Sequence, residues 1–166
     1  MHAIQVFTAF VGRIFLSAIF LFSGVMKLFG WEKSRQFYID TLTTLSLSER
    51  VATSIQAKID VMIQYSPLCL ALAVLFELIG GFMVFSGYKA RLGAFILLFF
   101  IVPTTIVFHS FWLFEDPARQ AVEMAMFMKN LAIIGGLLLV CAFGTGAHSK
   151  KSKSAPAADH GNEKSS

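Results

Sequence analysis

Residues 67–87 have the sequence PLCLALAVLFELIGGFMVFSG. This run is long enough to cross the roughly 30 Å of hydrocarbon in a bilayer as one helix, because an α-helix rises about 1.5 Å per residue. Its single charged side chain is Glu77, the eleventh of its 21 residues. An upright helix places this carboxyl group about 15 Å from either membrane face. The run therefore predicts a transmembrane helix with one carboxyl group near the middle of the bilayer.

Three further apolar runs accompany this one. The chain of 166 residues is 56% hydrophobic and 14% charged, with a mean hydropathy of +0.69, which excludes an ordinary soluble domain. We expect membrane helices at about residues 6–29, 67–87, 92–108 and 125–143. These runs lack the two-residue alternation of barrel strands, and a chain in lipid must satisfy its own backbone hydrogen bonds. The expected fold class is all-α, a four-helix transmembrane bundle.

The first loop is too polar to cross the membrane but has a helical pattern. Val51, Ile55, Ile59 and Met62 recur at three- and four-residue steps, which is typical of an amphipathic helix. A shorter helix is expected before it, at about residues 37–45. We expect this helical loop to cap the mouth of the bundle or to lie on the membrane surface, with a mobile helical loop as the alternative.

An even number of spans places both termini on one side of the membrane. We expect a membrane domain over residues 1–143 and a disordered basic tail over residues 144–166, which are rich in Gly, Ser and Lys. The short turn between the second and third spans carries Lys89 and Arg91 on the same side as the termini. Because basic loops favour the cytoplasmic side, this turn predicts that both termini are cytoplasmic.

The carboxyl group of Glu77 needs a partner. An ionised carboxylate at the bilayer centre costs at least about 3 kcal/mol unless it faces the bundle interior and is paired. We expect Arg13 to be this partner. It lies on the same helical face of the first span as Lys27, and its long side chain can extend from its position in the span toward the bilayer centre. We interpret this pair as a structural link between two helices rather than as a catalytic group.

A set of polar side chains is expected in the outer half of the bundle and forms the candidate ligand site. Its positive charges exceed its negative charge, so it suits a lipid head group, a quinone carbonyl or an acidic metabolite. The alternative for the two lysines is that they extend to the outer surface and anchor their helices. The candidate residues are Arg13, Ser23, Lys27, Glu77, His109, Trp112, Lys129 and Asn130.

Several chemistries are not expected. The sequence has no group of His and Cys at metal-ligand spacing, and the histidines other than His109 are near the termini, so we expect neither a metal site nor haem. We assign no catalytic residue and no covalently bound cofactor. The expected surroundings are the lipid bilayer and not a nucleic acid, with self-association into a homo-oligomer left open.

Five short motifs, taken together, resemble those of one family. Glycine and polar residues follow in the same order on the four expected helices as in the DoxX family of small bacterial four-helix membrane proteins. The motifs are Gly12-Arg13, Ser23-Gly24 with Lys27, Glu77-Leu78-Ile79-Gly80-Gly81, Phe108-His109 with Phe111-Trp112, and Lys129-Asn130 with Gly135-Gly136.

This resemblance implies a location in the bacterial inner membrane and a choice of roles. Related proteins are membrane subunits of thiosulfate:quinone oxidoreductase or partners of oxidative-stress enzymes, which favours an accessory role beside a soluble or membrane oxidoreductase, with a quinone as the ligand. More distant relatives include secretory cargo receptors, which favours binding. A transporter or carrier of small molecules or lipids, and an assembly subunit without a ligand, are the alternatives.

Overall fold

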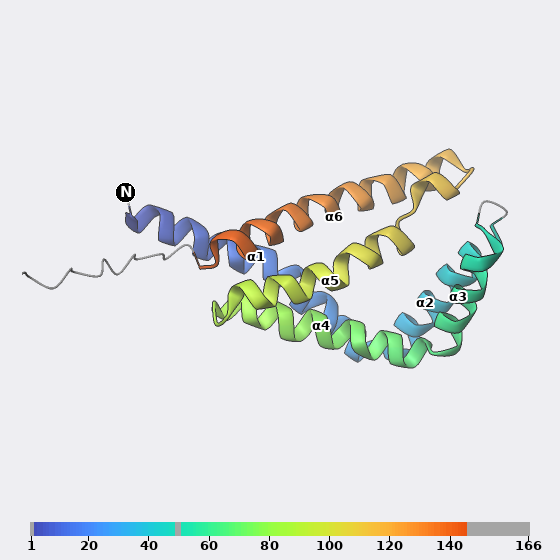
Figure 1. The fold of residues 1–166 in the computed structure, drawn as a ribbon, viewed down its shortest axis with the longest axis horizontal. Helices are drawn as coiled ribbons and strands as arrows, with labels where there is room; N and C mark the ends of the chain where they lie inside the picture. Colours follow the sequence, from blue (N-terminus) through green and yellow to red (C-terminus); the bar gives the residue numbers. More distant parts are fainter. Residues whose placement is uncertain (1, 49–50, 146–166) are drawn as a thin grey trace, which may run out of the picture.

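The computed structural model describes residues 2–48 and 51–145. In this part of the chain six α-helices and one short 3-10 helix follow one another (Figure 1). They are α1 (His2–Phe29), α2 (Trp31–Ser46), α3 (Thr53–Gln64), α4 (Ser66–Ser86), α5 (Ala90–Phe108), η1 (Phe111–Leu113) and α6 (Pro117–Phe143). The tail predicted over residues 144–166 lies, from residue 146 onward, outside the described residues.

Four of these helices, α1, α4, α5 and α6, are long and apolar enough to cross a membrane. The prediction of an all-α transmembrane bundle is therefore confirmed. The expected spans match the helices closely except at two starts, because α1 begins at His2 and α6 begins at Pro117. The early start of α6 has a local cause. The side chain of Asp116 accepts a hydrogen bond from the Arg119 backbone N–H at 2.9 Å, and Pro117 follows in the first turn.

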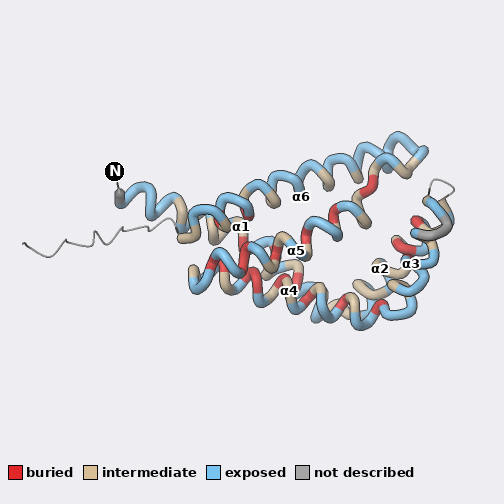
Figure 2. Tube along the Cα trace, in the orientation of Figure 1, coloured by how far each residue is buried: buried red, intermediate tan, exposed pale blue. Residues whose placement is uncertain are grey.

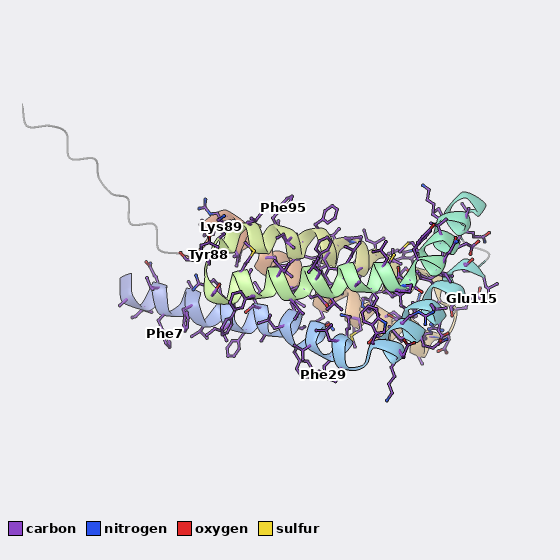
Figure 3. All side chains as sticks on the ribbon, turned by 90° about the horizontal axis from the view of Figure 1, so that it is seen from below. Phe7, Phe29, Tyr88, Lys89, Phe95 and Glu115 are labelled. Atoms are coloured by element: carbon purple, nitrogen blue, oxygen red, sulfur yellow. The ribbon has the colours of Figure 1, made fainter. Side chains whose placement is uncertain are left out.

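The outer surface of the bundle is apolar. Buried residues follow the inward faces of the helices, whereas the outward faces are exposed along their length (Figure 2). Phe7, Phe29 and Phe95 point away from the neighbouring helices in Figure 3, with exposed fractions of 67%, 88% and 63%. So many exposed aromatic rings are compatible with a lipid environment and incompatible with water.

Glycines bring α4 and α5 into close contact. A Cβ atom built on Gly93 would lie 2.6 Å from the Cβ of Met83 and 2.9 Å from the backbone oxygen of Gly80. A Cβ built on Gly80 would in turn lie 2.8 Å from Leu97. Membrane helices associate through such small residues, since lipid supplies no hydrophobic force between them.

The first loop forms a cap, as predicted. Leu42 and Leu45 of α2 and Ile59 of α3 are buried together, packed against Val107 and Phe108 at the end of α5. The pair α2–α3 therefore lies at one end of the bundle, opposite the end where α1 begins and α6 stops (Figure 1). The first helix of the pair, with 16 residues, is longer than the second, with 12, so the expected order of lengths was wrong.

Replacement of Gly93 by Ala should loosen the contact between α4 and α5. The added methyl group has no free space beside Met83 and the Gly80 carbonyl, so we expect a loss of about 1–3 kcal/mol in the free energy of unfolding. Unfolding by sodium dodecyl sulfate in mixed micelles measures this change. Gly135→Ala is the matched control, because a Cβ built on Gly135 meets no atom within 4 Å. Equal stability of the two variants would contradict the proposed close contact.

Candidate functional site

Glu77 is paired with Lys27, not with Arg13. The Lys27 Nζ lies 2.7 Å from Oε1 and 2.8 Å from Oε2 of Glu77. Ser23 completes the group, since its Oγ donates to Glu77 Oε1 at 3.0 Å and accepts from Lys27 Nζ at 2.6 Å. Glu77 is buried, with 3% of its surface exposed. Both of its carboxylate oxygens accept hydrogen bonds from side chains of α1. The prediction of an inward-facing, paired carboxylate holds, but the expected partner was wrong.

The direction of α1 explains why Lys27 is the partner. Helical side chains point toward the helix N-terminus, so the Lys27 side chain turns back to Ser23, one turn earlier, and to the carboxylate beside it. Arg13 lies 14 residues before Lys27, about 21 Å along the axis, and its side chain points farther away. A Cβ atom built on Gly87, at the far end of α4, would lie 3.4 Å from each terminal nitrogen of Arg13.

A small residue makes the approach of α1 to α4 possible. A Cβ atom built on Gly24 would lie 2.8 Å from the Leu78 side chain and 3.4 Å from the Glu77 Cβ. Gly24 stands between Ser23 and Lys27 in sequence, at the same level as the ion pair. The close approach allows the short Ser23 hydroxyl to reach the carboxylate directly.

A cavity of about 490 Å³ lies beside the ion pair. Most of its wall is apolar and comes from α1, α4, α5 and α6, with α2 of the cap across one side. Six of the eight candidate residues line it: Ser23, Lys27, Glu77, His109, Lys129 and Asn130. A pocket of this size, largely apolar with a few convergent polar groups, is typical of small-molecule sites.

Two candidate residues lie elsewhere. Arg13 lies near Gly87, at the opposite end of α4. Trp112 packs against Phe111 and Phe127, with ring centroids 5.1 and 5.9 Å away, and is absent from the described wall of the cavity. The aromatic residues after α5 therefore fasten η1 to α6, as a Trp near a membrane interface commonly does.

His109 has a carboxylate partner that the sequence analysis missed. Its Nδ1 lies 2.9 Å from Oε2 of Glu123 on α6. A carboxylate accepts hydrogen bonds, so Nδ1 carries the proton and Nε2 is the nitrogen left for a ligand. The Asp116-Pro117 helix start could have revealed Glu123, because it places this residue inside α6 rather than in a loop before residue 125.

The remaining polar groups differ in their environment. Asn130 is buried and donates from Nδ2 to Thr105 Oγ1 at 3.0 Å, which joins α5 to α6. Lys129 Nζ lies 3.3 Å from the sulfur of Met126, a weak acceptor.

Lys33 of α2 also lines the cavity, so three lysines and one carboxylate surround it even though Arg13 does not contribute. The predicted excess of positive charge is present with a different third member.

Tyr38, which lies in the shorter helix expected at about residues 37–45, is a further polar residue of the wall and was not among the candidate site residues. Burial raises the pKa of its phenol above the ordinary value, and a hydrogen bond to Cys69 adds to the shift. A tyrosine phenol is protonated at neutral pH even at its ordinary pKa, so Tyr38 is a hydrogen-bond donor at the edge of the cap.

Four membrane-crossing helices around an off-centre, largely apolar cavity with a few polar groups define a small multi-pass membrane protein with a ligand-sized interior. A family model described as DoxX matches residues 8–110, which is more than half of the chain. The chain therefore belongs to the DoxX family. The matched residues include Ser23, Lys27, Glu77 and His109 but not α6.

One curated relative is the inner membrane protein YqjF of Escherichia coli (strain K12). It is 38% identical to this chain over 80 residues, which cover 48% of this chain and 57% of that protein. The chain thus matches little more than half of the length of this relative. No solved structure matches the chain.

A double-mutant cycle tests the ion pair. Lys27→Met alone strands a buried carboxylate, and Glu77→Met alone strands an ammonium group, so each should lower the free energy of unfolding by about 3 kcal/mol. The double variant should lose much less than the sum, because no charge is left unpaired. Detergent unfolding of the four proteins gives the coupling energy. Additive losses would show that the two side chains do not stabilise each other.

Proposed function

We propose that this protein is a multi-pass protein of the bacterial inner membrane that binds a quinone-like molecule in its cavity, as an accessory subunit of a redox system. The name of the relative from Escherichia coli and the four apolar helices support the location. The cavity carries the proposal for binding, because it combines apolar walls with Lys27 and His109 at hydrogen-bonding positions. With both termini in the cytoplasm, the cavity faces the outer half of the membrane.

The balance of charge favours a neutral ligand for the deepest part of the cavity. Both oxygens of Glu77 accept hydrogen bonds from the Lys27 ammonium group. The opposite charges of the two groups cancel, so the pair has no net charge. An incoming carbonyl oxygen can replace Ser23 Oγ as the third acceptor of Lys27, while the Ser23 hydroxyl still donates to Glu77. A flat, lipid-soluble ring with carbonyl oxygens meets these demands better than a free anion, which would compete with Glu77.

His109 gives the same ligand a second contact. With Nδ1 held by Glu123, Nε2 can accept a hydrogen bond from a hydroxyl group, and it can donate one to a carbonyl when the ring is protonated. The site can therefore bind both a carbonyl and a hydroxyl form of one ring. A bound quinone supplies reversible two-electron chemistry, and we propose that a partner oxidoreductase exchanges electrons with it. Association with a soluble or membrane oxidoreductase, and self-association into a homo-oligomer, stay predictions.

A carrier for anionic small molecules is the second candidate. Lys129 and Lys33 favour it, because they line the cavity and neither ammonium group has a carboxylate partner among the described residues. Counterflow of labelled benzoate in proteoliposomes separates the two functions. Uptake that is lost in Lys129→Met and kept in Lys27→Met would favour the carrier over the quinone site.

Loss of Lys27 or His109 should weaken quinone binding. We expect Lys27→Gln and His109→Ala each to raise the dissociation constant of a short-chain ubiquinone about tenfold, the effect of one hydrogen bond to a charged or polar group. Quenching of tryptophan fluorescence in detergent solution measures the constant. Lys58→Gln, on the exposed face of α3, is the control and should bind as the wild type does. Unchanged binding in both cavity variants would refute the quinone site.

A further inference from the structure

A second polar region lies at the other end of the bundle, around the turn between α4 and α5. α4 is followed by Gly87, whose φ of +78° is the left-handed conformation that glycine adopts easily, and Lys89 has a φ of +47°. This turn brings Lys89 and Arg91 together at the end of the molecule where Tyr88 and Lys89 are labelled in Figure 3. Arg13 of α1 reaches the same turn.

The guanidinium group of Arg13 has buried donors without acceptors. Its Nε and Nη1 are inaccessible to solvent and have no hydrogen-bond partner among the described residues. Both terminal nitrogens lie against Gly87, at 3.4 Å from the position that a Cβ would occupy. A buried donor without an acceptor costs about 1–3 kcal/mol, and more when it is charged. Nη2, the third nitrogen of the group, is not among these buried atoms, so an acceptor with negative charge can reach the guanidinium group there and offset part of this cost.

A small cavity of about 220 Å³ adjoins the turn. Gly87, Lys89 and Arg91 contribute to its wall, together with Thr145 after the end of α6. Arg91 Nη2 also donates to the carbonyl of Ala142 at 3.2 Å, which fixes the start of α5 against the end of α6. Lys89 and Arg91 are the charged side chains among the described residues of this wall.

The depth of this region matches that of lipid head groups. It lies where α4 and α6 end and α5 begins, which is the boundary of the apolar spans. Tyr88 and Phe143 are exposed beside it, with exposed fractions of 68% and 63%, as aromatic residues at a membrane interface commonly are. A ligand here can therefore keep acyl chains in the bilayer while its head group enters the cavity.

We propose that Arg13, Lys89 and Arg91 form a binding site for the phosphate group of an anionic phospholipid. The guanidinium group of Arg13 can donate through Nη2, and the ammonium group of Lys89 adds a second positive charge. The site is separate from the quinone cavity, because Arg13 lies about 21 Å from Lys27 along α1. In the orientation with cytoplasmic termini, the site faces the inner leaflet, where anionic lipids attract basic residues.

Native mass spectrometry of the delipidated full-length protein tests this site. The probes are phosphatidylglycerol and phosphatidylcholine with identical acyl chains, each added to the protein in neutral detergent. We expect the wild type to retain phosphatidylglycerol preferentially and Arg13→Gln to weaken that retention about fivefold. Lys89→Asn should weaken it as well, and Asn tolerates the left-handed backbone at this position, so this variant decides the question if Arg13→Gln does not fold.

Arg35→Gln is the matched control at the opposite end of the bundle. Arg35 also has a buried Nε without a partner, but its Nη1 is paired with Glu32 at 3.2 Å, so its loss should leave lipid retention unchanged. Equal retention of the two lipids by the wild type, or wild-type retention in both Arg13→Gln and Lys89→Asn, would overturn the proposal. Displacement of phosphatidylglycerol by millimolar inorganic phosphate would also overturn it, because free phosphate would then be the ligand.

Discussion

A charged group in hydrocarbon needs an opposite charge beside it, and in this protein Lys27 meets that need for Glu77. α1 and α4 run in opposite directions (Figure 1), and the contact forms at only one register between them. Gly24 lets the two helices approach closely enough at that level for Ser23 to join the pair. The remaining helices pack around this buried ion pair.

The two ends of the bundle are built differently as a result. Toward the turn between α4 and α5 the core is apolar, with Val84, Ala94 and Leu97 fully buried. Toward the cap the helices enclose the cavity, and polar contacts such as that of Asn130 with Thr105 replace part of the apolar packing. The ion pair places polar groups inside the bundle. A ligand can therefore meet polar groups beside the pair without a change in the packing of the helices.

Much of the site follows from the sequence, since six of its eight expected residues line one cavity. The errors share a cause. Arg13 was chosen for its depth and the reach of its side chain, whereas that side chain points toward the start of α1 and reaches Gly87. Glu123 was placed outside the membrane helix, although α6 extends back to Pro117 and brings this carboxylate to His109. Both mistakes concern the pairing of groups on different helices.

The sequence by itself determined that the chain crosses a membrane four times, that the first loop is helical, and that Glu77 faces inward. These properties depend on hydropathy and periodicity along one helix at a time, because the cost of exposing a charge or a peptide group to lipid is the same for any arrangement of neighbours. The tertiary structure alone decided which base neutralises Glu77, where Arg13 lies, and that His109 meets Glu123. Those contacts depend on the register between helices and on the direction of each side chain. Both are fixed by packing between residues that are far apart in the sequence.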